Sequence, residues 1–429
     1  MRIFKFTPAA VLASAVCAVW GADVPMGPFL YTAAPQYDRA AESNRFPKGA
    51  AVILISESGK RRIAPAFYAS ADATVSFDGA RILFAGKTAA ATPWQIWEIP
   101  AAGGAPRQIV NCQTDCTHPL YIPDGRIAYT RASAAGSDIE IVDAKGGSPQ
   151  RLTFAPGRHV TQDVLRDGRI LFESGGELYT VYPDGTGVES LRCDHGPHRS
   201  DARQIASGDV IFSVGARLAR FTPPLAAQAD VAQPQGESAG PVAEIAPGKW
   251  LISLRKSNGP FGIFVWTREG GRIEPMETPA GTNAIQPVLL RSRTAPKQFP
   301  SGLVETRTNG NLLCLDARAT KDQSITEAVA AVQMYTRDAA GAAVLLGRQN
   351  VAGDGSFYVQ VPADRPLRIE LLNAAGGTIR SERGWFWMRP SEQRICVGCH
   401  AGPEQSPENK VPEVLLRSIV PEKLLGATK

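Results

Sequence analysis

The residues best suited to chemistry lie near the carboxyl end, where Cys396, Cys399 and His400 form the pentapeptide Cys-Val-Gly-Cys-His. This C-x-x-C-H spacing is typical of covalent attachment of a c-type haem. Two cysteines three positions apart lie on one turn of backbone, so both reach the two vinyl carbons along one haem edge. The histidine that follows then ligates the iron. The motif predicts one haem c, bound by Cys396 and Cys399, with His400 as the proximal ligand.

Two other interpretations of the motif stay open. A thiol–disulfide pair would sit at a helix start beside a βαβ pattern, which this sequence lacks, and a zinc site would need two further ligands. A sixth iron ligand must come from upstream, from a partner, or be absent. Met388, eight residues before Cys396, is a candidate distal ligand, or else a strand residue that packs with Trp385 and Trp387.

The remaining cysteines fall into separate groups. Cys112 and Cys116 are four residues apart, which permits a disulfide in a loop of an exported protein. The segment Cys193-Asp-His195-Gly-Pro-His198 has the spacing of a second metal site, for zinc or copper, or else is a polar loop. Cys314 lies in the apolar stretch NLLCLDA and is expected to be buried.

A repeated phrase organises the chain before the haem motif. A glycine turn followed by a short apolar strand recurs at 78–86, 124–130, 167–174, 207–213 and 247–253. A second strand–turn–strand phrase follows each copy, and a period of 40 to 46 residues with several strands is typical of a β-propeller blade. Residues 30–75 can supply a sixth blade, closed by a strand near 287–291. The repeats resemble the PD40 repeats of TolB-type six-bladed propellers.

The four histidines outside the haem motif, His118, His159, His195 and His198, fall between the repeated phrases. Loops at such junctions gather at one mouth of a propeller. We therefore expect a group of histidines at that mouth, as a possible metal site or distal haem site.

The predicted fold is all-β: a six-bladed TolB-like β-propeller, a small β-sandwich and a short C-terminal c-type haem segment. The propeller is predicted over 30–293 and an antiparallel sandwich over 302–390, with the haem segment at 391–429. Residues 294–302 form the linker between the first two. Glycine (41) and proline (33) are abundant, as such a turn-rich fold requires.

The amino terminus has the features of an export signal. Arg2 and Lys5 precede an apolar run that ends in small residues, which predicts a cleaved signal peptide over 1–22. We expect a periplasmic or otherwise exported protein with no membrane span in its mature chain. The formal net charge of +5 is spread along the chain, so nucleic acid is not an expected partner.

The order of these features resembles a known family. A propeller, a sandwich with DGSFYVQVPADRPLRIELL and the closing WFWMRPSEQRICVGCH are similar to the α-subunit of hydrazine synthase and to proteins that share its middle domain. The resemblance implies a periplasmic c-type cytochrome on a propeller, with Cys396, Cys399 and His400 binding haem. The family's synthase has two haem motifs and a tyrosine shortly after the motif histidine. This chain has one motif, followed by Ala401-Gly402-Pro403-Glu404, so hydrazine synthesis is not expected.

Three functional hypotheses follow. The first is an exported mono-haem cytochrome that transfers electrons to a redox partner protein or a small molecule. The second is a periplasmic haem enzyme that acts on a small nitrogen or oxygen species at an open iron position. The third is a TolB-like binding module in which the haem is structural.

Overall fold

The structure is a computed structural model that describes residues 26–39, 46–192, 196–222, 227–298, 300–320, 327–398 and 410–426. Strands dominate it. The helical elements of the described ranges are the 3-10 turn η1 (Glu269–Gly271) and the short helix α1 (Glu413–Arg417). The prediction of an all-β chain is therefore confirmed. No helix in these ranges is long and apolar enough to cross a membrane.

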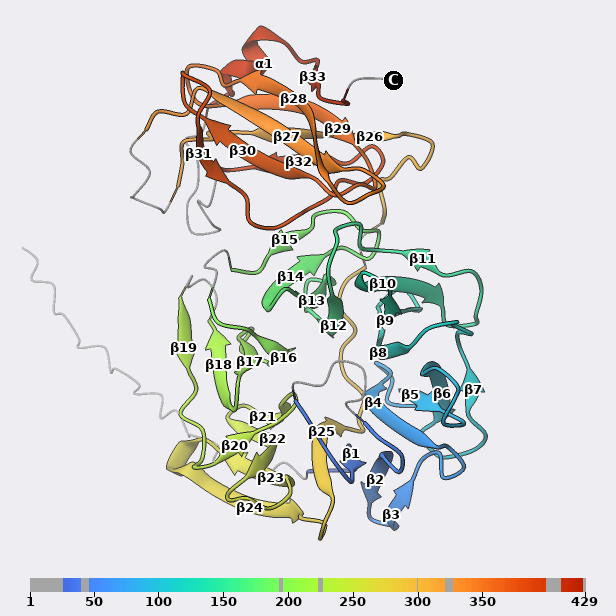
Figure 1. The fold of residues 1–429 in the computed structure, drawn as a ribbon. Coiled ribbons are helices and arrows are strands. Elements are labelled where there is room, and N and C mark those ends of the chain that lie inside the picture. Colours follow the sequence, from blue (N-terminus) through green and yellow to red (C-terminus); the bar gives the residue numbers. More distant parts are fainter. Residues whose placement is uncertain are drawn as a thin grey trace, which may run out of the picture.

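The first body of the molecule is built from antiparallel four- and five-stranded sheets between residues 29 and 289. Figure 1 shows them arranged in a ring. In chain order the six sheets found there are β1 (Phe29–Ala34), β2 (Ala51–Ser56), β3 (Gly59–Arg62) with β25 (Asn283–Leu289); β4 (Ala69–Val75), β5 (Arg81–Lys87), β6 (Gln95–Pro100), β7 (Arg107–Gln108); β8 (Cys116–Tyr121), β9 (Arg126–Ser133), β10 (Gly136–Asp143), β11 (Gln150–Arg151); β12 (His159–Val164), β13 (Ile170–Ser174), β14 (Glu177–Val181), β15 (Glu189–Ser190); β16 (Ser200–Gln204), β17 (Val210–Val214), β18 (Arg217–Phe221), β19 (Gln228–Asp230); and β20 (Glu237–Ser238), β21 (Ala243–Ala246), β22 (Lys249–Arg255), β23 (Gly262–Thr267), β24 (Arg272–Glu277).

The repeated Asp-Gly dipeptides form the hairpin turns that the sequence predicts. Between β4 and β5, Gly79 has φ +75°, a conformation that glycine adopts at little cost. The carboxylate of Asp78 accepts a hydrogen bond from the backbone N–H of Ala80, at 3.0 Å. The turn at Asp124 repeats this bond to Arg126, also at 3.0 Å. The side chain of the aspartate therefore fixes each turn, as in other Asx-type turns.

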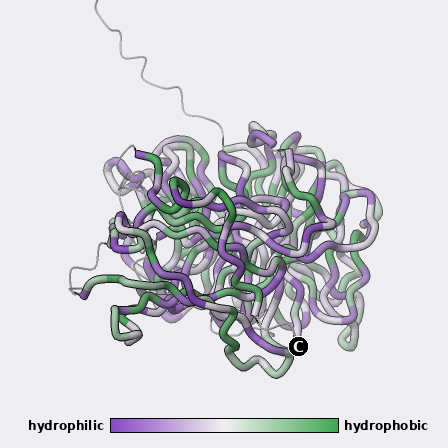
Figure 2. Tube along the Cα trace, turned by 90° about the horizontal axis from the view of Figure 1, so that it is seen from above, coloured by the Kyte–Doolittle hydropathy of each residue, from purple (hydrophilic) through white to green (hydrophobic). Residues whose placement is uncertain are grey.

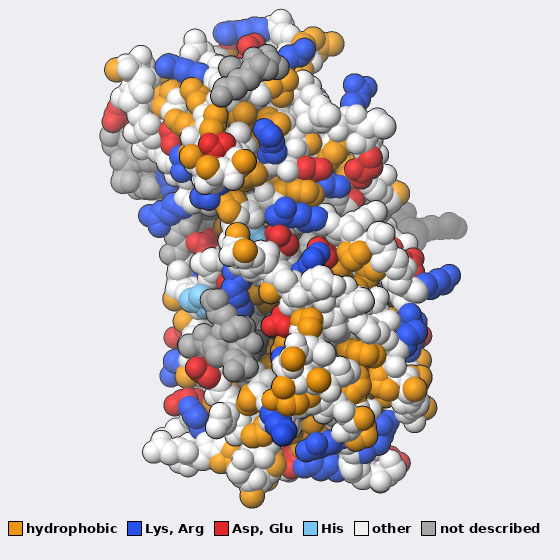
Figure 3. Space-filling model, turned by 45° about the vertical axis from the view of Figure 1, so that its right-hand side comes forward, with side chains coloured by type: hydrophobic (Ala, Val, Ile, Leu, Met, Phe, Trp, Pro, Cys, Tyr) orange, Lys and Arg blue, Asp and Glu red, His pale blue; other side chains and the backbone are white. Residues whose placement is uncertain are grey.

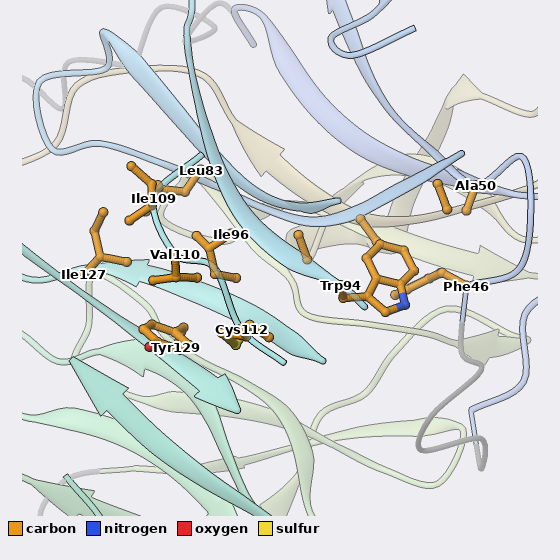
Figure 4. Packing of buried hydrophobic residues seen from close by; sticks show 14 of the residues in the cluster. Phe46, Ala50, Leu83, Trp94, Ile96, Ile109, Val110, Cys112, Ile127 and Tyr129 are labelled. Carbon is orange, nitrogen blue, oxygen red and sulfur yellow. A yellow bond between two sulfur atoms is a disulfide. The ribbon is translucent and has the colours of Figure 1, made fainter. Parts of the chain in front are cut away.

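Inner strands of the ring such as β4 and β5 are buried on both faces. Along β5, Ile82 packs in the cluster shared with the first sheet, whereas Leu83 packs in the cluster shared with the third. This alternation follows from the two-residue period of a strand. Figure 4 shows the second of these clusters, with Leu83 and Ile96 beside Ile127 and Tyr129. Figure 2 shows hydrophobic and hydrophilic residues interspersed along the chain when the molecule is viewed from above.

Strands from the two ends of this first body close the ring. β25 pairs with β1, and both bring side chains to β4. Thr32 donates a hydrogen bond to Oε1 of Gln286 at 2.7 Å, while Nε2 of Gln286 donates to Asp72 at 2.7 Å. These buried bonds join strands more than 200 residues apart in sequence.

The second body is a sandwich of two four-stranded sheets. One contains β26 (Asn309–Cys314), β29 (Phe357–Pro362), β32 (Gln393–Cys396) and β33 (Glu422–Lys423); the other contains β27 (Ala331–Arg337), β28 (Ala343–Asn350), β30 (Arg368–Leu372) and β31 (Thr378–Ser381). Their inner faces share one apolar cluster.

Within 302–390 the strands pair antiparallel, as expected. Two strands beyond that range join one sheet in parallel, β32 beside β26 and β33 beside β29. The chain leaves one sheet after β31 and crosses to the other before β32 begins, so β32 can enter in the direction of β26.

Candidate functional site

The site is centred on Cys396, the last residue of β32. In the parallel ladder with β26, Cys396 is the register partner of Cys314. The backbone N–H of Leu315 donates to the carbonyl of Cys396 at 2.9 Å, so the first cysteine of the C-x-x-C-H motif is held by the sandwich. Cys399 and His400 lie outside the described residues.

The glycine of the motif permits a close approach to the sandwich. A Cβ on Gly398 would lie 2.7 Å from both the side chain and the carbonyl oxygen of Ala319. A larger residue would therefore push the end of β32 away from the loop that follows β26. Glycine allows the chain to lie against this loop as it leaves the strand.

A cavity of about 2020 Å³ opens beside Cys396, between the ring and the sandwich. The ring contributes Tyr179, Tyr182 and Leu191, and the sandwich contributes Cys314 and Trp385, among other residues. The volume is larger than the 300–1,000 Å³ typical of small-molecule sites. Figure 3 shows one face of the two bodies, on which acidic and basic side chains are mixed.

The segment before β32 is attached to one turn of the ring. The indole N–H of Trp387 donates to the carbonyl of Gly185 at 2.9 Å, and Nε of Arg389 donates to the carbonyl of Asp184 at 3.0 Å. The backbone N–H of Gly187 donates to the carboxylate of Glu392 at 3.0 Å. We call the turn 184–187, which connects β14 and β15, the docking turn.

The docking turn depends on glycine. Gly185 has φ +86°, and a Cβ there would lie 2.8 Å from the side chain of Arg389. Backbone conformation and close contact both exclude a larger residue.

Aromatic side chains surround the same junction. Trp387 is 1% exposed and packs against Phe154, His159 and Phe172 of the ring. The guanidinium groups of Arg337 and Arg368 lie 4.8 and 5.1 Å from the centroid of the Trp385 ring. Of the two tryptophans, Trp385 lines the large cavity, whereas Trp387 packs in the core.

Burial sets the electrostatic state of several groups near this junction. It raises the pKa of the Cys396 thiol above its ordinary value. Burial also raises the pKa of Asp364, although Arg389 opposes this shift from 2.6 Å. The pKa of His159 is lowered, mainly because its imidazole is buried.

The candidate distal ligand Met388 is fully buried among the apolar side chains of the sandwich. It packs there with residues such as Leu367 and Leu371. Met388 lies between β31 and β32 rather than in a strand, and it packs in the sandwich cluster, whereas Trp385 and Trp387 pack in a cluster of the ring.

Cys112 and Cys116 form a disulfide in the structure. The bond closes the loop that leads into β8, and Cys112 packs beside Val110 in the cluster of Figure 4.

The histidines are only partly collected at one mouth. His118 and His198 line a second cavity of about 370 Å³ in the ring. Contrary to expectation, His118 and His159 belong to strands β8 and β12, and His159 is buried, with its Nε2 2.9 Å from the carbonyl of Ala155. His118 lies at an irregularity of β8, where its φ is +50°.

The proposed second metal site at Cys193, His195 and His198 cannot be assembled from described residues, because Cys193 and His195 lie outside them. The rest of the chain, as far as it is described, contains no cluster of three or more histidine, cysteine or acidic residues able to hold a metal ion.

Two features of the site were missed in the sequence. The register of Cys314 with Cys396 arises from a parallel pairing of segments 82 residues apart, which no local pattern predicts. The docking turn looks like an ordinary Asp-Gly hairpin, although the buried tryptophan at 387 was a signal that this segment packs against something.

The comparisons with known proteins agree with the resemblance found in the sequence. Residues 312–401 match the family model of the hydrazine synthase alpha subunit middle domain. Hydrazine synthase subunit alpha of Kuenenia stuttgartiensis is 34% identical over 58 residues, which are 14% of this chain and 7% of that protein.

Among solved structures, Kuenenia stuttgartiensis hydrazine synthase is similar with a TM-score of 0.80 at 16% identity, covering 92% of this chain and 72% of that chain. TolB from Acinetobacter baumannii matches with a TM-score of 0.48 at 14% identity, covering 61% of this chain and 66% of that chain. The chain thus has the β-propeller-containing fold seen in hydrazine synthase, and its residues 312–401 are similar to that subunit's middle domain.

Proposed function

We propose that this chain is an exported mono-haem c-type cytochrome that transfers electrons, with its haem in the cavity between the ring and the sandwich. The observation that carries the proposal is the position of Cys396, whose motif has the haem-attachment spacing and which lines the large cavity. Cys396 and Cys399 would form the thioether bonds, and His400 would be the proximal ligand.

The cavity walls fit such a group. Apolar and aromatic residues, among them Leu312, Phe357 and Trp385, would exclude water from a haem face. Bound haem c would supply a one-electron iron couple, whose potential depends on burial and on nearby hydrogen bonds. The protein's part is to hold the attachment segment in place, which the parallel ladder and the docking turn do at its two ends.

We further infer that the six sheets of the ring are the blades of a six-bladed propeller, closed by the pairing of β1 with β25. This body would serve as a scaffold and as a docking surface for a redox partner. The export signal predicted over 1–22 lies outside the described residues, and it supports a periplasmic location, where c-type haem is attached.

The test is an absorption spectrum of the full chain, produced with its export signal in cells able to attach haem c. We expect a covalent c-type spectrum that survives denaturation, and its loss in the double variant Cys396→Ser, Cys399→Ser. The matched control is Cys112→Ser, Cys116→Ser, which removes the separate C-x₃-C pair and should keep the haem. A chain that purifies with stoichiometric zinc and no covalent haem would show that the motif was misinterpreted.

A second candidate is a haem enzyme acting on a small nitrogen or oxygen species. The large cavity volume favours it, because a site of about 2020 Å³ leaves space for a ligand beside the cofactor. A high-spin haem that binds carbon monoxide would support the enzyme, and a six-coordinate low-spin haem would support electron transfer.

A further inference from the structure

The residue opposite the haem motif is itself a cysteine. Cys314 ends β26 and Cys396 ends β32, and the two are register partners in the parallel ladder. Neighbouring strands lie roughly 4.7–4.9 Å apart. That spacing falls within the roughly 4.4–6.8 Å between Cα atoms over which a disulfide can form.

The two side chains point to the same face. In a parallel ladder, register partners project on one side of the sheet. Cys314 is buried in the apolar cluster of the sandwich, and Cys396 packs against the same cluster. Both also line the cavity beside the motif, and both are thiols in the structure.

We propose that Cys314 and Cys396 form a reversible disulfide in the haem-free protein, and that this bond blocks haem attachment. The regulatory part of this inference rests on the proposed function, whereas the bond itself does not. A sulfur held in a disulfide cannot add to a haem vinyl group, so the oxidised chain would have to be reduced before it could accept the cofactor.

The chemistry balances with an oxidant of the exported compartment, a disulfide carried by a thiol-oxidising protein. The thiolate of Cys396 attacks that disulfide and displaces one thiol, which leaves a mixed disulfide on Cys396. The thiolate of Cys314 then attacks the sulfur of Cys396 and displaces the second thiol. Two electrons pass to the oxidant, and the two protons given up by the cysteines end on its two displaced thiols.

The bond is tested on the full chain produced without haem attachment and incubated with oxidised glutathione. Free thiols are then alkylated and the protein is digested with trypsin without reduction. Cleavage after Arg307, Arg318, Arg394 and Lys410 separates Cys314 from the peptide that contains both Cys396 and Cys399. Cys399→Ser leaves Cys396 as the one cysteine of that peptide, so a cross-link in this variant identifies the bonded pair.

We expect the 308–318 and 395–410 peptides to be joined in Cys399→Ser and separate in Cys314→Ala. The peptide with Cys112 and Cys116 is the internal control, because it carries its own disulfide throughout. Full alkylation of Cys314 and Cys396 in folded Cys399→Ser would overturn the inference, as would a cross-link that needs Cys399.

Haem attachment is measured separately. Under added oxidant, Cys314→Ala should carry about two-fold more covalent haem than the unaltered chain, because the competing disulfide is absent. A cross-link in a chain that never acquires haem would refute the proposed function but would still support the disulfide between Cys314 and Cys396. If the unaltered chain and Cys314→Ala carry the same, normal amount of covalent haem under oxidant, the regulatory role is overturned.

Discussion

Individual side chains at the junction between the two bodies owe their chemistry to burial. Burial raises the pKa of the Cys396 thiol and so favours its protonated form. The pKa of His159 shifts in the opposite direction, to a lower value. Its imidazole is 2% exposed and packs against Trp387, and burial disfavours its charged form.

His159 should make stability depend on pH. Its folded pKa lies below the unfolded value of about 6.5, so between these values the unfolded chain binds more protons. Stability is therefore complete above about pH 6.5 and falls as the pH drops towards the folded pKa. We expect His159→Phe to lose less melting temperature than the unaltered chain between about pH 7.5 and pH 5. His198→Gln is the control, since that side chain is 66% exposed, and parallel curves for all three proteins would contradict the assignment.

Whole elements show which parts of the fold local sequence can specify. The hairpins were predictable because each carries its own turn, as at Asp78 and Asp124, and because apolar residues alternate along its strands. The pairing of β1 with β25 was anticipated from the repeat, whereas the parallel pairing of β26 with β32 was not. A parallel pair has no turn of its own, so its register is set by packing of the whole sandwich and leaves no local pattern.

Where β1 and β25 close the ring, the side chain of Gln286 joins Thr32 to Asp72. Gln286→Ala removes both bonds and leaves Thr32 with a buried hydroxyl, at a cost of about 2–3 kcal/mol. We expect a lower urea midpoint, with earlier amide exchange in β1 and β25 than in the sandwich strands. Gln108→Ala, at an exposed position of β7, is the control. It should change the free energy of unfolding by less than about 0.5 kcal/mol. Equal midpoints for the two variants would show that closure does not depend on this side chain.

At the scale of the whole molecule, the ring and the sandwich are joined at the docking turn by the segment that leads into the C-x-x-C-H motif. Trp387 belongs by sequence to the sandwich and by packing to the ring, where it lies in the cluster of Ile139 and Phe172. One hydrophobic cluster therefore contains residues of both bodies. A change in how the bodies sit against each other would move the cavity wall that contains Cys396.

Trp387→Ala should uncouple the two bodies. The substitution removes a fully buried indole and its bond to Gly185, a loss of about 3–5 kcal/mol in a packed core. Trp250→Ala is the matched control, because Trp250 is equally buried but packs with Trp266 inside the ring, away from the junction. We expect Trp387→Ala to split thermal unfolding into two transitions and to speed amide exchange at Gly187, whose N–H bonds to Glu392. Trp250→Ala should lower stability by a similar amount and keep Gly187 protected under native conditions. If both variants exposed Gly187 equally, its protection would report global stability, and the two bodies would be coupled by something other than the docking turn.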